Sequence, residues 1–146
     1  MNSFHNDPEV KKKYLDRVIF HQKADHLVRG QGWEDGKGCA VGCTLENYNH
    51  AAYEKELGIP EWLAQVEDTL FEGMSEEKSR TWPEKFLEAI PIGVDLEPVK
   101  AKFLCVLLRH TLKSMDAAQY DAEKWPGVKA AIEGSKSAVN QMIEAQ

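Results

Sequence analysis

Residues 30–44 read GQGWEDGKGCAVGCT and interrupt what is otherwise a succession of helical segments. The stretch holds five glycines, two cysteines and one lysine, a composition that ordinary helix packing does not require. Glycine weakens a helix interior, but it permits tight turns and close backbone approach. The stretch therefore divides the chain into helices before it and helices after it, and it is the first place to look for a site.

The segments on both sides of this loop carry the start and stop signals of helices. Asp7-Pro8-Glu9 supplies an N-cap, a proline at the first helical position and an acid in the first turn, and Gly30 marks the expected end. No segment shows sustained alternation of apolar and polar residues. We predict an all-α fold, one compact domain over residues 1–146, with about six or seven helices. The Gly-rich loop at residues 30–44 is where a short strand is expected.

The longest apolar run, Phe103 to Leu108, lies within a helix expected from Leu96 to about Met115. A helix that is apolar all round is normally surrounded by other helices. The run therefore predicts that this helix is the central one and that Cys105 fills the core.

A second helix, expected from Pro60 to Gly73, has a clear apolar stripe. Glu67, Asp68 and Glu72 fall on its other side and are expected to form a solvated acidic face. They are not expected to bind two metal ions, because the paired Glu-x-x-His motifs of such bundles are missing. The residues of the apolar stripe are Trp62, Leu63, Val66, Leu70 and Phe71.

Composition excludes several classes of function. A net charge of -6 and a pI near 5.4 argue against a general nucleic-acid binder, whose affinity comes from Lys and Arg neutralising phosphates. No window approaches the ~20 apolar residues that span a bilayer, and no apolar leader opens the chain. The three cysteines, an odd number in a chain that needs no disulfide, fit a reducing compartment. We expect a soluble, cytoplasmic protein with no membrane or nucleic-acid partner.

The second half of the loop has the composition of an anion-binding nest. Gly36 and Gly38 let backbone N–H groups turn toward one point, where Lys37 supplies a positive charge. Trp33 and Cys43 are expected to line the same pocket. The segment is neither a Walker loop nor a dinucleotide fingerprint, because the residue after Lys37 is glycine and no strand–helix–strand unit surrounds it.

Cys39 is the candidate nucleophile. A cysteine at the start of a helical turn and near a lysine has its thiolate favoured, and it then needs a base and an orienting group. His21 and Asp25 fall on one face of the preceding helix and could supply both. This hypothesis predicts that a mild electrophile labels Cys39 faster than Cys105.

Two other interpretations of these residues remain open. In the first, Cys39 and Cys43 are small apolar residues of a tightly packed segment, and His21 and Asp25 form a buried pair that holds the first helix in register. In the second, Cys39, Cys43 and His50 bind zinc, but three ligands leave that set incomplete, so no metal site and no cofactor is predicted. A disulfide between Cys39 and Cys43 is not expected, because an i,i+4 spacing on one helical turn separates them too far.

The string GKGCAVGCT resembles a family of small bacterial proteins described as hypothetical, together with HQKAD upstream and HAAYEKELGIP and WPEKFLEAIP downstream. The likeness covers roughly residues 16–108, and it implies where a site lies without implying an activity. Our hypothesis is a protein that binds a small polar or anionic ligand at the Cys loop, with acyl transfer or hydrolysis by Cys39 as the enzymatic version. The alternative is an oligomeric scaffold or regulatory interaction protein without catalysis.

Overall fold

The computed structural model describes residues 1–117 and 126–145. These residues form eight α-helices, one 3₁₀ helix and one two-stranded sheet, which confirms the predicted all-α class. Contacts within the chain group into two units, Met1–Glu97 and Pro98–Gln146. The expectation of a single domain over the whole chain therefore stays a prediction, and each unit is described by itself.

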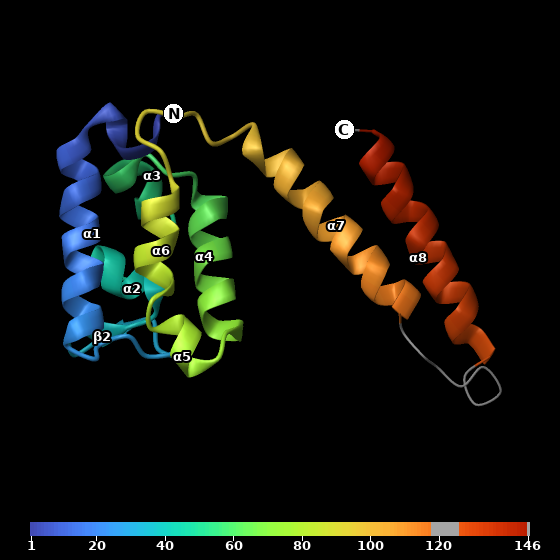
Figure 1. Ribbon diagram of the computed structural model, residues 1–146, viewed down its shortest axis with the longest axis horizontal. Coiled ribbons are helices and arrows are strands. Elements are labelled where there is room, and N and C mark those ends of the chain that lie inside the picture. Colours follow the sequence, from blue (N-terminus) through green and yellow to red (C-terminus); the bar gives the residue numbers. More distant parts are fainter. Residues whose placement is uncertain (118–125, 146) are drawn as a thin grey trace. The chain divides into compact units, whose positions relative to one another are not determined.

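The first unit is a compact helical body built around two short central helices. Figure 1 shows α2 and α6 in the space between α1 and α4, and both central helices contact both outer ones. Its core includes the fully buried side chains of Phe4, Tyr53, Leu57 and Leu87. In chain order its elements are a 3₁₀ helix at Ser3–Asn6, α1 at Pro8–Lys23, β1 at Trp33–Glu34, β2 at Lys37–Gly38, α2 at Ala40–Leu45, α3 at Ala52–Leu57, α4 at Glu61–Gly73, α5 at Glu76–Ser79 and α6 at Trp82–Ala89.

Helix α1 begins as the sequence predicts but ends earlier. The Asp7 side chain accepts a hydrogen bond from the Glu9 amide at 2.8 Å, and Pro8 is the first helical residue. The helix stops at Lys23 rather than at Gly30, because Asp25 adopts a left-handed conformation with φ of 57°. Asp residues tolerate this conformation better than most. The prediction that His21 and Asp25 share one helical face is therefore wrong.

The Gly-rich loop folds into the expected short strands. Strands β1 and β2 pair antiparallel with Trp33 opposite Gly38, and Asp35 and Gly36 make the turn between them with positive φ angles. Gly42, in α2, lies directly against the carbonyl oxygen of Gly32, and a Cβ atom there would overlap that oxygen. Glycine in this stretch thus permits the strand and the helix to approach at backbone distance.

Helix α4 corrects the expected acidic face. Its buried residues are Ala64, Glu67, Asp68 and Phe71, whereas Leu70, which was expected to face the core, is 39% exposed. The neighbouring helices α2, α3 and α6 pack on the side of α4 that carries Glu67 and Asp68. Two carboxyl groups therefore lie inside the first unit, and Glu72 is the exposed member of the three.

The second unit pairs two long helices, α7 at Val99–Ala117 and α8 at Pro126–Glu144 (Figure 1). Leu104, Val106 and Leu107 of α7 are between 44% and 64% exposed. The prediction that the apolar run at residues 103–108 forms a central, surrounded helix is therefore wrong. The run has apolar side chains on all sides, but α7 has one helical neighbour in its unit, and that neighbour covers one side. Among the described residues, no helix has the length and apolarity needed to cross a bilayer.

Candidate functional site

Cys39 is held at the junction of β2 and α2. Its amide donates to the carbonyl oxygens of Gln31 at 2.7 Å and Gly32 at 3.1 Å. Its sulfur caps α2 by accepting from the Gly42 amide at 3.4 Å, so the expected helical start at Cys39 is confirmed. The side chain is 1% exposed, which makes Cys39 part of the core as well as part of the loop.

The surroundings of Cys39 do not favour a thiolate. Burial raises the pKa of the Cys39 thiol far above its ordinary value, and the nearby Asp68 carboxyl group raises it further. The Gly42 amide lowers this pKa, but its effect is smaller. The thiol therefore stays protonated at neutral pH, which is the opposite of the activation that a cysteine nucleophile requires.

His21 is buried in a cluster of rings rather than beside Cys39. Its Nδ1 atom lies 3.1 Å from Nδ1 of His26, and its ring meets the edge of Trp33 with centroids 5.3 Å apart. Nε2 of His21 lies 3.4 Å from a carboxylate oxygen of Glu46, within ion-pair distance but without hydrogen-bond geometry. Burial lowers the pKa of His21 despite Glu46, so the imidazole is neutral at neutral pH.

Asp25 is separated from both partners that the sequence suggested for it. Its exposed carboxylate lies 3.4 Å from the Arg80 guanidinium, which also pairs with Glu76 at 3.0 Å. Within the described residues, no hydrogen bond or ion pair joins Asp25 to His21 or to Cys39. The structure thus places the three residues of the catalytic hypothesis in three different surroundings.

The residues predicted to bind an anion are also divided. Lys37 lines a depression together with Asp25, Arg29, Glu76 and Arg80, and Cys39 lines a different cavity. Gly36 sits at the exposed tip of the β1–β2 turn, whereas Gly38 is buried and its amide donates to the carbonyl oxygen of His26 at 3.0 Å, so the Gly38 amide is already occupied.

Cys43 and Trp33 serve the packing of the loop. The Cys43 thiol donates to the carbonyl oxygen of Gly38 at 3.4 Å, and burial raises its pKa to about 12. Trp33 is half-buried against His21. Cys43 thus joins α2 to the end of the loop, and Trp33 joins the loop to α1.

The cavity beside Cys39 is formed mainly by residues outside the predicted site. It has a volume of about 360 Å³, and it opens between the first half of the Gly-rich loop and the middle of α4. Its lining residues are Gly30, Gln31, Gly32, Cys39, Tyr48, Asp68 and Glu72.

Asp68 is the central polar group of this cavity. Its Oδ2 atom accepts a hydrogen bond from the Tyr48 hydroxyl at 3.2 Å. The same oxygen lies 3.2 Å from Nε2 of His50. Its Oδ1 atom is buried and accepts no hydrogen bond of ordinary geometry, although the Asp68 side chain lies close enough to the Cys39 thiol for a hydrogen bond that raises the pKa of that thiol. Because a thiol is a weak donor, the Asp68 carboxyl group keeps the capacity to accept a stronger hydrogen bond.

Glu72 gives the cavity a second carboxylate and fixes the loop. Its Oε2 atom accepts a hydrogen bond from the Gly30 amide at 2.8 Å. The Tyr48 ring lies against Gly32, where a side chain would collide with it. The loop is thus attached to α4 at one end and covered by an aromatic ring in the middle. Among the described residues, none that lines the cavity is a lysine or an arginine.

Glu67, the neighbour of Asp68, points into the core. It is fully buried, its Oε2 atom accepts from the Tyr53 hydroxyl at 2.5 Å, and its Oε1 atom has no partner. Burial raises the pKa of Glu67 to about 8, with the Asp68 charge adding to the increase and the Tyr53 hydrogen bond opposing it. Glu67 therefore carries a proton at neutral pH.

One sequence signal could have revealed the buried acids. Ala64, Glu67, Asp68 and Phe71 recur at the three- and four-residue spacing of a single helical face, and the small and aromatic ends of that series are typical core residues. The competing apolar series on the same helix is longer, so the spacing alone did not identify the buried face. Tyr48 lies outside the loop motif and carried no signal of its own, and the spacing of His50 from the two cysteines suggested a zinc ligand instead of a partner of Asp68.

From the structure we expect thiol labelling in the order opposite to that of the catalytic hypothesis. Cys105 lies half-buried on α7, whereas Cys39 and Cys43 are buried and their thiols have raised pKa values. Iodoacetamide at neutral pH should modify Cys105 first, and it should reach the other two only under denaturing conditions. Peptide mass spectrometry over a time course measures this order, and Cys105→Ser should leave the folded chain nearly unlabelled. Rapid modification of Cys39 in the folded chain would restore the nucleophile hypothesis.

Comparison of the chain with protein-family models, curated proteins and solved structures finds no match.

Proposed function

We propose that the protein binds a small polar ligand in the cavity between residues 30–32 and α4, and that the ligand presents a positively charged or hydrogen-bond-donating group to Asp68. The volume of about 360 Å³ lies within the range of small-molecule sites. The proposal concerns binding. The raised pKa of the Cys39 thiol gives no support to acyl transfer by that residue.

The observation that carries the proposal is the Asp68 carboxyl group in the cavity wall. Tyr48 and His50 already occupy Oδ2, so the carboxyl group is oriented by its own protein, and the weak Cys39 thiol is the one further donor near it among the described residues. A ligand N–H group placed at Oδ1 would give this buried oxygen a stronger donor. A ligand carboxylate or phosphate would face Asp68 and Glu72 with like charge and is disfavoured.

Tyr48 supports the same choice of ligand. The Tyr48 side chain is half exposed, and its hydroxyl donates a hydrogen bond to Asp68. The Tyr48 ring is therefore held at the rim of the cavity. An aromatic face beside a carboxylate is a favourable surrounding for an ammonium or amidinium group. The proposed ligand class is therefore amines, amidines and related donors, in place of the anions that Lys37 and its glycines suggested.

The matched probes benzylamine, benzamidine and benzoate, which share a ring and differ in charge, test this proposal. We expect millimolar benzylamine or benzamidine to shift the backbone amide NMR signals of Gly30, Gly32 and Cys39, and benzoate to leave them unchanged. Asp68→Asn should weaken this binding at least about tenfold, because a charge-assisted hydrogen bond is worth roughly 1.5 to 3 kcal/mol. Asp25→Asn is the matched control, since Asp25 is an exposed carboxylate that lines a different depression.

Two results would contradict the proposal. One is preferential binding of benzoate. The other is amine binding that Asp25→Asn weakens as much as Asp68→Asn does. Thermal unfolding of each variant shows whether the first unit remains folded. Tyr48→Phe removes the hydroxyl but leaves Oδ1 of Asp68 unaltered, so this variant should retain most of the amine binding.

A further inference from the structure

Helices α7 and α8 contact each other through one stripe of side chains on each. Figure 1 shows the two helices running antiparallel, side by side. Most half-buried residues of α7 recur at the spacing of one helical face, and Phe103 lies outside this series. The half-buried residues of α8 also recur at that spacing, and Lys136 is the charged one among them. The apolar residues of the two series are Ala101, Cys105, Leu108 and Leu112 on α7, and Val128, Ile132, Val139 and Ile143 on α8. A pair of helices joined by one stripe leaves the remaining sides of both helices open.

A second apolar surface lies beside that stripe. At about 100° per residue, Leu104 and Leu107 of α7 fall about a quarter of a turn from the contact stripe. On α8, residues with small or flexible side chains recur at spacings of three and four and fall to the same side of the antiparallel pair. We call this surface the hairpin face, made of Leu104, Leu107, Ala131, Gly134, Ala138 and Met142, all of which are exposed.

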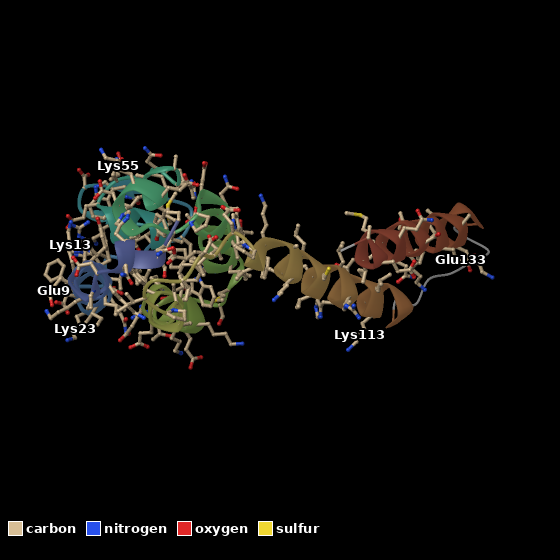
Figure 2. All side chains as sticks on the ribbon, turned by 90° about the horizontal axis from the view of Figure 1, so that it is seen from above. Glu9, Lys13, Lys23, Lys55, Lys113 and Glu133 are labelled. Carbon is tan, nitrogen blue, oxygen red and sulfur yellow. The ribbon has the colours of Figure 1, made fainter. Side chains whose placement is uncertain are left out.

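The opposite side of the helix pair has a different composition. It carries Lys102, Arg109 and Lys113 on α7, and Lys129, Glu133, Asn140 and Glu144 on α8, at the corresponding helical positions. Figure 2 shows the Lys113 side chain projecting out from α7. The charged side also carries the exposed Val106, whereas among the described residues Lys100, one turn before Leu104, is the one charged residue on the side of the hairpin face. The pair is thus more charged on one side than on the other.

Gly134 indicates what covers the hairpin face. It lies in the middle of α8, where glycine is among the poorest helix formers, and its φ angle does not require glycine. A Cβ atom added there would meet no atom within 4 Å, so no contact in the described chain excludes a side chain at this position. Small residues at Ala131, Gly134 and Ala138 would let a further helix approach closely.

We infer that the hairpin face binds the hairpin face of a second copy of this chain, making a four-helix bundle. The large residues Leu104 and Leu107 of one copy would fit over the small residues Gly134 and Ala138 of the other, and a two-fold interface requires such self-complementarity. Helices of 19 residues are about 28 Å long at 1.5 Å per residue, and two side by side are roughly 20 Å wide. Two copies would then cover about 1,100 Å² in total, which passes the roughly 1,000 Å² expected of a specific interface.

The full-length chain tests this inference by sedimentation equilibrium at concentrations up to about 100 µM, a range that detects dissociation constants in the micromolar range. We expect a dimer. Gly134→Leu should raise its dissociation constant at least tenfold while the monomer keeps or gains helix content, because leucine favours helix and collides with nothing in its own chain. Ala130→Leu, an equivalent change on α8 outside the hairpin face, should leave the dissociation constant unchanged.

Leu107→Lys provides a second test, since a charge buried between two copies opposes association. A monomer at every concentration would overturn the inference, and the hairpin face would then be left for a different partner. It would also be overturned by a dimer that resists both Gly134→Leu and Leu107→Lys, or by one that Ala130→Leu weakens equally. Circular dichroism identifies any variant that has lost its helices, so that the remaining substitution decides the outcome.

Discussion

Gly42→Ala is expected to destabilise the first unit by about 3 kcal/mol or more, as overpacking against fixed backbone does. The added methyl group would overlap the carbonyl oxygen of Gly32. That oxygen cannot withdraw freely, because it also accepts a hydrogen bond from the Cys39 amide at 3.1 Å. Urea unfolding followed by tryptophan fluorescence measures the loss as a lower transition midpoint.

Gly73→Ala is the matched control for this substitution. Gly73 is the last residue of α4, it has no positive φ angle, and a Cβ atom there would meet nothing within 4 Å. Alanine should therefore leave stability unchanged or raise it by up to about 1 kcal/mol. Equal stability of the Gly42→Ala and Gly73→Ala variants would show that the loop and α2 are not packed at backbone distance.

The stability of the first unit is expected to fall as pH rises from about 5 to about 8. The pKa of Glu67 is about 8 in the folded chain against 4.5 for an ordinary glutamate, so within this window the folded state keeps a proton that the unfolded state has released. The unfolded state binds fewer protons there, and each pH unit lowers the free energy of unfolding by about 1.4 kcal/mol. The full decrease is up to about 5 kcal/mol, and it levels off above the folded-state pKa.

Glu67→Gln isolates this effect because glutamine is a neutral group of the same shape. The variant should be about as stable as the parent at pH 5 and clearly more stable at pH 9, measured by urea unfolding at each pH. Glu77→Gln, at an exposed position on α5, should follow the parent across the whole range. A pH dependence that is the same in the parent and in Glu67→Gln would mean that Glu67 ionises normally in the folded chain.

Several local features of this structure can be predicted from neighbouring residues in the sequence. The cap at Asp7, the proline at Pro8 and the start of a helix at Cys39 depend on neighbours within a few residues, and all three are confirmed. The position of the short strands within residues 30–44 is confirmed for the same reason, because glycine-dependent turns are local. The all-α class follows from helical spacing summed over many segments.

The chemistry of the candidate site could not be predicted from neighbouring residues in the same way. Cys39 was identified from the loop, but its chemistry depends on burial and on Asp68, which lies 29 positions away in the chain. Asp25 lies two residues beyond the end of α1 in a left-handed conformation, so it is not the partner of His21 that helical spacing predicts. Lys37 lines a depression with Arg80 and Glu76, residues that the packing of α5 and its C-cap brings near the loop.

By itself, the sequence determined where several helices start and where the backbone needs glycine, because each of these depends on local sterics. Only the tertiary structure decided that Glu67 and Asp68 are inside, that Cys39 is a protonated thiol and that one face of α7 and α8 is uncovered. These outcomes depend on which neighbours displace water from a given side chain. Desolvation is a property of the packed neighbourhood, and residues distant in the chain supply most of that neighbourhood.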